Sequence, residues 1–110
     1  MAKLVILEPA QRELEEIAMA HLHLVGPNSA RRITDLIYDT IGRLEQFPLS
    51  GHPPRDRWLA RENYRYVIAG KYIAVYRFME AENVVFIYHI AHGARNYPAL
   101  FKRLLKEQVN

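Results

Sequence analysis

The stretch Asn63–Tyr97 decides the predicted fold and reads NYRYVIAGKYIAVYRFMEAENVVFIYHIAHGARNY. It contains three runs rich in Tyr, Val, Ile and Phe, at 64–69, 72–79 and 84–91. Such residues suit a pleated, half-buried strand. Gly70-Lys71 and the polar residues 80–83 separate the runs, and connectors this short join only antiparallel neighbours. We therefore predict a three-stranded antiparallel meander.

Side chains alternate across a strand, so the predicted meander has two different faces. Alternate positions of its first two strands carry large side chains, namely Tyr64, Tyr66, Ile68, Tyr72, Tyr76 and Phe78. We predict that these residues form one bulky apolar face. Arg65 and Arg77 then lie together on the opposite face, which we expect to be the working surface.

The segments around the meander predict helices that cover its apolar face. Lys3–Leu7 is typical of a short strand, and Glu8-Pro9 favours a helix start because proline suits the first helical turn. A buried stripe extends from Leu14 to Val25 before Gly26-Pro27 ends the helix. A second amphipathic helix, capped by Asn28 or Ser29, extends to Phe47.

Two helices with so short a connection should pack antiparallel on the sheet. Residues 98–107 predict a short closing helix. The expected fold class is α+β, with an N-terminal strand and a helical hairpin on a mainly antiparallel sheet, as one domain spanning residues 1–110.

The segment Pro48–Glu62 (PLSGHPPRDRWLARE) predicts an irregular loop, because three prolines and a glycine disfavour regular structure. Trp58 and Leu59 are its expected anchors to the body. Arg55 and Arg61 are expected to remain in solvent as binding residues.

Composition limits the chemistry of the chain. It has no cysteine, which excludes thiol catalysis, disulfides and cysteine-ligated zinc. No apolar run is long enough to span a membrane and no signal peptide is recognisable, so we expect a cytoplasmic protein. Residues 1–51 hold five Lys or Arg against seven acids, whereas residues 52–110 hold ten against five. The sheet half is therefore basic and suits a polyanionic or acidic partner.

The candidate site is the basic cluster where the last strand ends. His92, Arg95 and Tyr97 occur there together, with Arg65 and Arg77 on neighbouring strands. Arginine matches phosphate geometry, tyrosine stacks on bases, and histidine transfers protons near neutral pH. Such a set could cleave RNA through its 2′-hydroxyl, although arginines on an exposed sheet face are more often solvated or paired with the acids of a partner. The histidine spacings do not suit a metal, and we expect no cofactor.

The order of several short phrases resembles the RelE/ParE superfamily of toxins from type II toxin–antitoxin, or plasmid stabilisation, modules. The similar phrases are Leu44-Glu45-Gln46-Phe47-Pro48, Gly51-His52-Pro53-Pro54-Arg55, Tyr64-Arg65, Tyr72–Arg77 and His92-Gly93-Ala94-Arg95. The resemblance covers nearly the whole chain. It implies the same α+β fold.

The two branches of the superfamily imply different activities. RelE-like members are ribosome-dependent endoribonucleases (mRNA interferases), and ParE-like members inhibit DNA gyrase without catalysis. On the nuclease interpretation the resemblance and the chemistry assign catalysis to Arg65, Arg95, His92 and Tyr97, and binding to Arg77, Lys71, Arg55 and Arg61. Val67, Ile73 and Phe101 stand where RelE-like toxins carry lysine, arginine and tyrosine. Both targets therefore stay open.

The resemblance also implies partners. A cognate antitoxin would neutralise the basic face, in a homodimer or a toxin–antitoxin heterotetramer, with the ribosome and mRNA or gyrase as the target. The alternative function is a non-toxic binding module that only holds its antitoxin.

Overall fold

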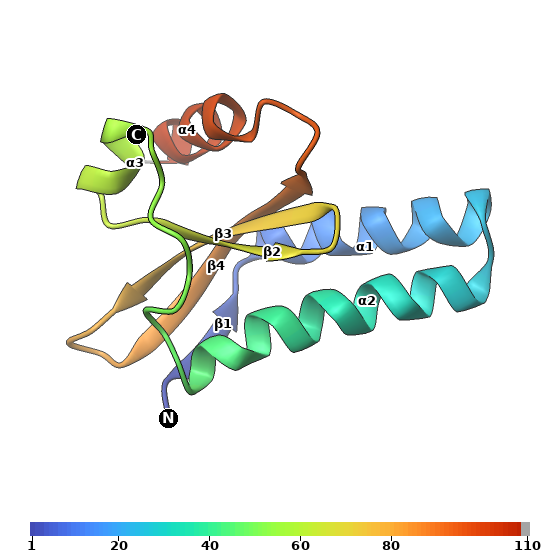
Figure 1. The fold of residues 1–110 in the computed structure, drawn as a ribbon, viewed down its shortest axis with the longest axis horizontal. Helices are drawn as coiled ribbons and strands as arrows, with labels where there is room; N and C mark the ends of the chain where they lie inside the picture. The colour runs from blue at the N-terminus through green and yellow to red at the C-terminus, as the bar shows by residue number, and fades with distance from the viewer. Residues whose placement is uncertain (109–110) are drawn as a thin grey trace.

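The structure is a computed structural model that describes residues 1–108, so the last two residues of the expected 1–110 domain lie outside the described part. Its elements follow in the order β1 (Lys3–Ile6), α1 (Glu8–Leu24), α2 (Pro27–Gly42), a 3₁₀ turn η1 (Arg43–Glu45), α3 (Arg57–Arg61), β2 (Arg65–Ala69), β3 (Tyr72–Met79), β4 (Val84–His92) and α4 (Tyr97–Gln108) (Figure 1). No helix in this part of the chain is long and apolar enough to cross a membrane.

The four strands form one mixed sheet in the order β1-β4-β3-β2. The predicted meander is confirmed, because β2 pairs with β3 and β3 with β4, both antiparallel. β1 joins the far side of β4 in parallel register, with Lys3 opposite Val84 and Ile6 opposite Ile87. The α+β fold class predicted from the sequence is therefore confirmed.

The predicted division of the two faces was wrong. Across the two-residue turn, Ala69 pairs with Tyr72, which sets Tyr66 opposite Val75 and Arg65 opposite Tyr76. Directly opposite residues of an antiparallel pair share a face. Tyr66 therefore lies on the face opposite to Tyr76. Arg65 and Arg77 also lie on opposite faces of the sheet, because Arg65 shares the face of Tyr76 and alternation sends Arg77 the other way.

A β-bulge adds a second change of face in β4. Val75 pairs with His89, whereas Tyr76 pairs with Ile87, so Tyr88 is the extra residue. A bulge of this kind reverses the alternation of the strand beyond it. Both Ile87 before the bulge and Ile90 after it consequently contribute to the same core.

Helices cover both faces of the sheet (Figure 1). The α1–α2 hairpin packs on one face, where its buried residues Leu14, Ile37 and Ile41 join Tyr76 and Ile87. The opposite face carries a second core. Its buried members are Leu59, Tyr64, Ile73, Val75, Ala91, Phe101 and Leu105.

The expected open working face is thus largely occupied by α3 and α4. The prediction that the segment 48–62 lacks regular structure was wrong for Arg57–Arg61, which form α3. Asp56 caps this short helix, since its Oδ1 accepts a hydrogen bond from the Leu59 N–H at 3.0 Å. The predicted anchoring by Trp58 and Leu59 is confirmed, because both belong to the second core.

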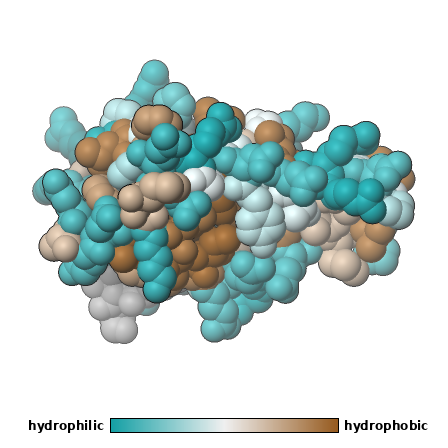
Figure 2. Space-filling model, turned by 90° about the horizontal axis from the view of Figure 1, so that it is seen from below, coloured by the Kyte–Doolittle hydropathy of each residue, from teal (hydrophilic) through white to brown (hydrophobic). Residues whose placement is uncertain are grey.

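The hairpin tip differs from the predicted buried stripe. Pro27 begins α2, with Gly26 in the cap position, so neither Asn28 nor Ser29 caps the helix. Leu24 and Val25 at the end of α1 are 84% and 73% exposed. The hairpin extends beyond the sheet in Figure 1, and Figure 2 shows hydrophobic residues at that same end of the molecule.

Candidate functional site

A pocket of about 280 Å³ at the β2 edge of the sheet is lined by three of the predicted site residues, Arg65, Tyr97 and Arg55. We call it the arginine–tyrosine pocket. Its other lining residues are Pro54, Asp56, Leu59, Tyr66, Val75, Pro98 and Phe101. The loop before α3, the start of β2 and the start of α4 therefore form its walls.

A row of aromatic rings borders this pocket, and the sequence analysis did not assign it a role. The His52 ring stacks on Tyr66 with centroids 5.2 Å apart, and Tyr66 lies 5.6 Å from Tyr97. Tyr97 in turn lies 6.0 Å from Phe101. The sequence did contain a signal for this row. The two-residue β2–β3 turn pairs Ala69 with Tyr72, and this pairing places Tyr66 on the α4 side of the sheet. Such rings offer flat surfaces for stacking beside Arg55, which lines the same pocket.

The loop before α3 is fixed by the buried hydroxyl of Tyr76. This hydroxyl donates to the Pro48 carbonyl oxygen at 2.8 Å and accepts from the Gly51 N–H at 2.9 Å. Burial raises the pKa of Tyr76 above its usual range, although the Gly51 N–H opposes the shift. Arg65 adds a third link, because its Nη1 donates to the Gly51 carbonyl oxygen at 3.1 Å.

Two titratable groups of the arginine–tyrosine pocket, Tyr97 and Asp56, have pKa values shifted away from neutrality. Burial, followed by the neighbouring Tyr66 phenol, raises the pKa of Tyr97. The Leu59 N–H lowers the pKa of Asp56, and Lys102, whose Nζ lies 3.3 Å from its Oδ2, lowers it further. At pH 7 these groups are a neutral phenol and a fixed carboxylate. Neither is suited to take up and release a proton.

His92 and Arg95 line a different pocket, of about 310 Å³, between α1 and α4. The His92 ring lies 5.3 Å from the ring of Tyr72, and its Nδ1 accepts a hydrogen bond from the Ala94 N–H at 3.0 Å. Arg95 is exposed and forms no ion pair in the described residues. The structure therefore divides the four predicted catalytic residues between two pockets.

His89 occupies a structural position. It is 3% exposed, and its Nδ1 lies 3.0 Å from Oε2 of Glu13 on α1. The other oxygen of the same carboxylate accepts the Ile90 N–H at 2.9 Å. β1 pairs with β4 only as far as Ile87. The Glu13 carboxylate thus takes the place of a strand partner beyond that point.

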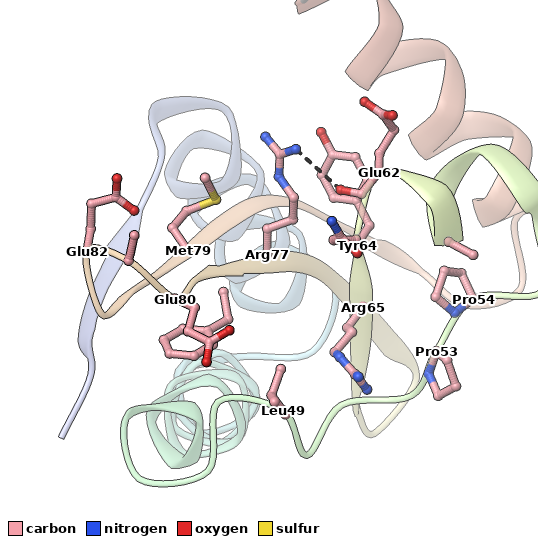
Figure 3. A pocket seen from close by; sticks show the side chains of 14 residues that line it. Leu49, Pro53, Pro54, Glu62, Tyr64, Arg65, Arg77, Met79, Glu80 and Glu82 are labelled. Carbon is pink, nitrogen blue, oxygen red and sulfur yellow. Dashed lines mark hydrogen bonds between the residues drawn. The ribbon is translucent and has the colours of Figure 1, made fainter.

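Arg77 is held by its neighbours on the α4 side of the sheet (Figure 3). Its Nε and Nη2 donate to the Tyr88 hydroxyl at 3.1 and 2.9 Å, and its Nη1 donates to the Glu62 carbonyl oxygen at 3.3 Å. The guanidinium carbon lies 4.6 Å from the centre of the Tyr64 ring, within cation–π range. Arg77 therefore joins β3, β4 and the end of α3.

The remaining predicted binding residues lie apart from one another. Lys71 is exposed in the β2–β3 turn, and Arg61 is exposed at the end of α3. Within residues 1–108 no group of three histidine or acidic side chains is placed to hold a metal ion.

A family comparison matches residues 4–97 to the model of the ParE toxin of type II toxin–antitoxin systems, parDE. The chain belongs to the ParE toxin family. No curated protein matches the chain. The match ends at Tyr97, so it includes all of the sheet except Lys3, the hairpin and α3, and stops where α4 begins.

Solved structures show the same fold at low sequence identity. The chromosomal ParDE system from P. aeruginosa superposes with a TM-score of 0.69 and 20% identity, covering 84% of this chain and 96% of that chain. A chain of the toxin–antitoxin complex RelBE2 from Mycobacterium tuberculosis superposes with a TM-score of 0.58 and 22% identity, covering 83% of this chain and 96% of that chain. The isolated E. coli RelE toxin superposes with a TM-score of 0.52 and 15% identity, covering 94% of this chain and 99% of that chain. The RelE/ParE-like fold predicted from the sequence is confirmed.

Within this ParE fold, all three positions expected to depart from RelE-like toxins lie in a core. Val67 is 9% exposed and belongs to the core beneath the hairpin. Ile73 is 6% exposed and Phe101 is 1% exposed, and both belong to the core between the sheet and α4. These positions serve packing in this family member.

Proposed function

We propose that this ParE-family protein is a growth-inhibiting toxin that acts by binding DNA gyrase and does not cleave RNA. The observation that carries the proposal is the division of the candidate catalytic residues. Arg65 and Tyr97 line the arginine–tyrosine pocket, whereas His92 and Arg95 line another pocket. RNA cleavage needs a proton donor and a proton acceptor within hydrogen-bond reach of one ribose and phosphate.

The basic residues of the second half are suited to binding. Arg55, Arg61, Lys71 and Arg95 are exposed, and the ion pairs of the described residues involve none of them. Exposed cations of this kind steer association with an acidic protein surface or with DNA. We assign target binding to them, and to Arg95 first, because it lies at the end of β4 beside the start of α4.

The implied partner is a cognate antitoxin. Two of the similar structures are a ParDE system and a RelBE2 toxin–antitoxin complex. An acidic segment of the antitoxin would cover the same exposed cations and so prevent target binding.

Two parallel reactions test the proposal. In the first, purified protein is added to gyrase with relaxed plasmid; in the second, to cell-free translation of a defined mRNA whose 5′ ends are mapped. We expect loss of supercoiling with intact mRNA. Ribosome-dependent cuts in the mRNA would overturn the proposal, and inactivity in both reactions would favour a module that only holds its antitoxin.

Matched arginine variants then test the assigned surface. We expect Arg95→Ala to weaken gyrase inhibition at least about fivefold, because a buried or partly buried charge contact is worth 1 kcal/mol or more. Arg12→Ala is the control, since Arg12 is exposed on α1 and forms an ion pair with Glu8 of the same helix, at 3.6 Å. Equal inhibition by both variants would remove Arg95 from the binding surface.

A further inference from the structure

The sheet has an unpaired edge beside a large pocket. β2 pairs with β3 only as far as Arg65 opposite Tyr76, whereas β3 continues to Met79 against β4. Asn63, in the left-handed region with φ 65°, turns the incoming chain away before it reaches the end of β3. Among the described residues, Arg77–Met79 therefore have a strand neighbour on one side only, which is β4.

The backbone of Phe78 faces this open side. The N–H and C=O of Tyr66 bond to His52 on the outer edge of β2. Successive residues of a strand bond to opposite sides, so the N–H and C=O of Arg65 point inward, toward Tyr76 of β3. Groups that bond to one neighbour recur at every second residue of a strand. The Phe78 N–H and C=O, two residues beyond Tyr76, consequently point away from β4 and into the pocket.

The pocket has a volume of about 570 Å³, and its lining is both apolar and acidic (Figure 3). Leu49, Pro53, Pro54, Phe78 and Met79 supply its apolar part. Its acidic side chains are those of Glu62, Glu80 and Glu82, which are exposed. None of the three forms an ion pair in the described part of the chain.

The two arginines that line the same pocket are already engaged within the chain. Arg77 is bonded to Tyr88 and Glu62, and Arg65 is bonded to Gly51. Figure 3 shows Arg65 beside the loop at Pro53 and Pro54, on the other side of the pocket from Glu80 and Glu82. The β3–β4 turn therefore presents two acids, Glu80 and Glu82, that are not paired with a cation of the described residues.

We propose that this groove, defined as the edge of β3 from Arg77 to Met79 with the turn 80–83, docks an extended partner segment that carries lysine or arginine. The segment adds one short strand beside Phe78, exchanging backbone hydrogen bonds with it. Its basic side chains contact Glu80 and Glu82, and its apolar side chains contact the Leu49 and Met79 part of the pocket. The chain itself shows that this side of the sheet accepts such a segment, because His52 bridges to Tyr66 farther along the edge. The inference is independent of the proposed target.

A labelled heptapeptide of alternating lysine and valine tests the groove. We expect saturable binding in fluorescence anisotropy, with the Phe78 amide signal shifted in ¹⁵N spectra and its hydrogen exchange slowed. The double variant Glu80→Gln/Glu82→Gln should weaken binding about fivefold or more, because two ion pairs are lost. Glu15→Gln/Glu16→Gln on α1 is the matched control and should leave binding unchanged.

Two further probes separate strand addition from simple charge attraction. A peptide N-methylated at alternate residues cannot donate to the Phe78 carbonyl oxygen and should bind at least about tenfold more weakly. The second probe is a peptide of alternating glutamate and valine, which should bind more weakly than the lysine–valine peptide. The proposal would be overturned if the methylated peptide bound equally well, if the control variant lost as much binding, or if the glutamate–valine peptide were preferred. Formation of a dimer through this edge in light scattering would show that the occupant is a second copy instead.

Discussion

The Tyr76 hydroxyl and the Gly51 backbone are in direct contact, with the Gly51 N–H donating to the hydroxyl oxygen at 2.9 Å. The same hydroxyl donates to Pro48. One buried side chain of β3 thus fixes the loop that carries His52 and leads to α3. The walls of the arginine–tyrosine pocket depend on this contact.

Removing the hydroxyl should destabilise the fold. Tyr76→Phe leaves the Gly51 N–H and the Pro48 carbonyl oxygen without their bonding partner in a buried site. The expected loss of unfolding free energy is about 1–3 kcal/mol. Urea denaturation followed by circular dichroism measures it. Tyr38→Phe is the control because Tyr38 is 41% exposed on α2. Equal stability of the two variants would contradict the role of the Tyr76 hydroxyl.

Two glycine substitutions should act in opposite directions. A β-carbon on Gly51 would lie 2.5 Å from the Tyr76 hydroxyl oxygen and 2.9 Å from the Tyr66 carbonyl oxygen. Gly51→Ala should therefore lower stability by about 1–3 kcal/mol through overpacking. Gly42, with no atom within 4 Å of an added β-carbon, lies in α2. Gly42→Ala should raise stability by about 0.5–1 kcal/mol. Thermal denaturation compares them, and a stabilising Gly51→Ala would be inconsistent with the packed loop.

The cap of α3 should give stability a dependence on acid. The pKa of Asp56 is lowered below its unfolded value of 3.8 by the Leu59 N–H. A lowered folded pKa stabilises the fold above the unfolded pKa, and this contribution is lost as the pH falls through the folded pKa. Wild type should therefore exceed Asp56→Asn in stability at pH 7, with the difference shrinking below about pH 3.8. Denaturation at pH 7, 5 and 3 measures it; a difference that does not change with pH would exclude a charged cap.

The Glu13 carboxylate should matter more than other acids of α1. Glu13→Ala removes the acceptor of the Ile90 N–H and the carboxylate partner of buried His89. We expect a loss of about 2–4 kcal/mol, because a backbone donor and a histidine lose their acceptor in a buried site. Glu15→Ala, at an exposed position of the same helix, should change stability by less than about 0.5 kcal/mol. Equal effects in urea denaturation would show that Glu13 has no special role.

The separation of the predicted site residues shows what local pattern cannot supply. Arg65 and Arg77 are both in strands, as predicted, yet they lie on opposite faces of the sheet. His92 and Arg95 are close in sequence to Tyr97, but the turn after β4 leaves them facing α1 while Tyr97 faces β2. A sequence motif records spacing along the chain, whereas a site depends on which elements its side chains face.

The sequence by itself determined the strands, the helical hairpin and the antiparallel meander, because apolar periodicity and short connectors are local properties. It also contained the register of β2 and β3, since a two-residue turn makes Ala69 and Tyr72 partners. Only the tertiary structure decided which face each side chain of β4 takes beyond the Tyr88 bulge, and how α3 and α4 pack on the sheet. It also decided that β3 extends past the end of β2. These features arise from contacts between segments far apart in the chain, and no local window of sequence contains both partners.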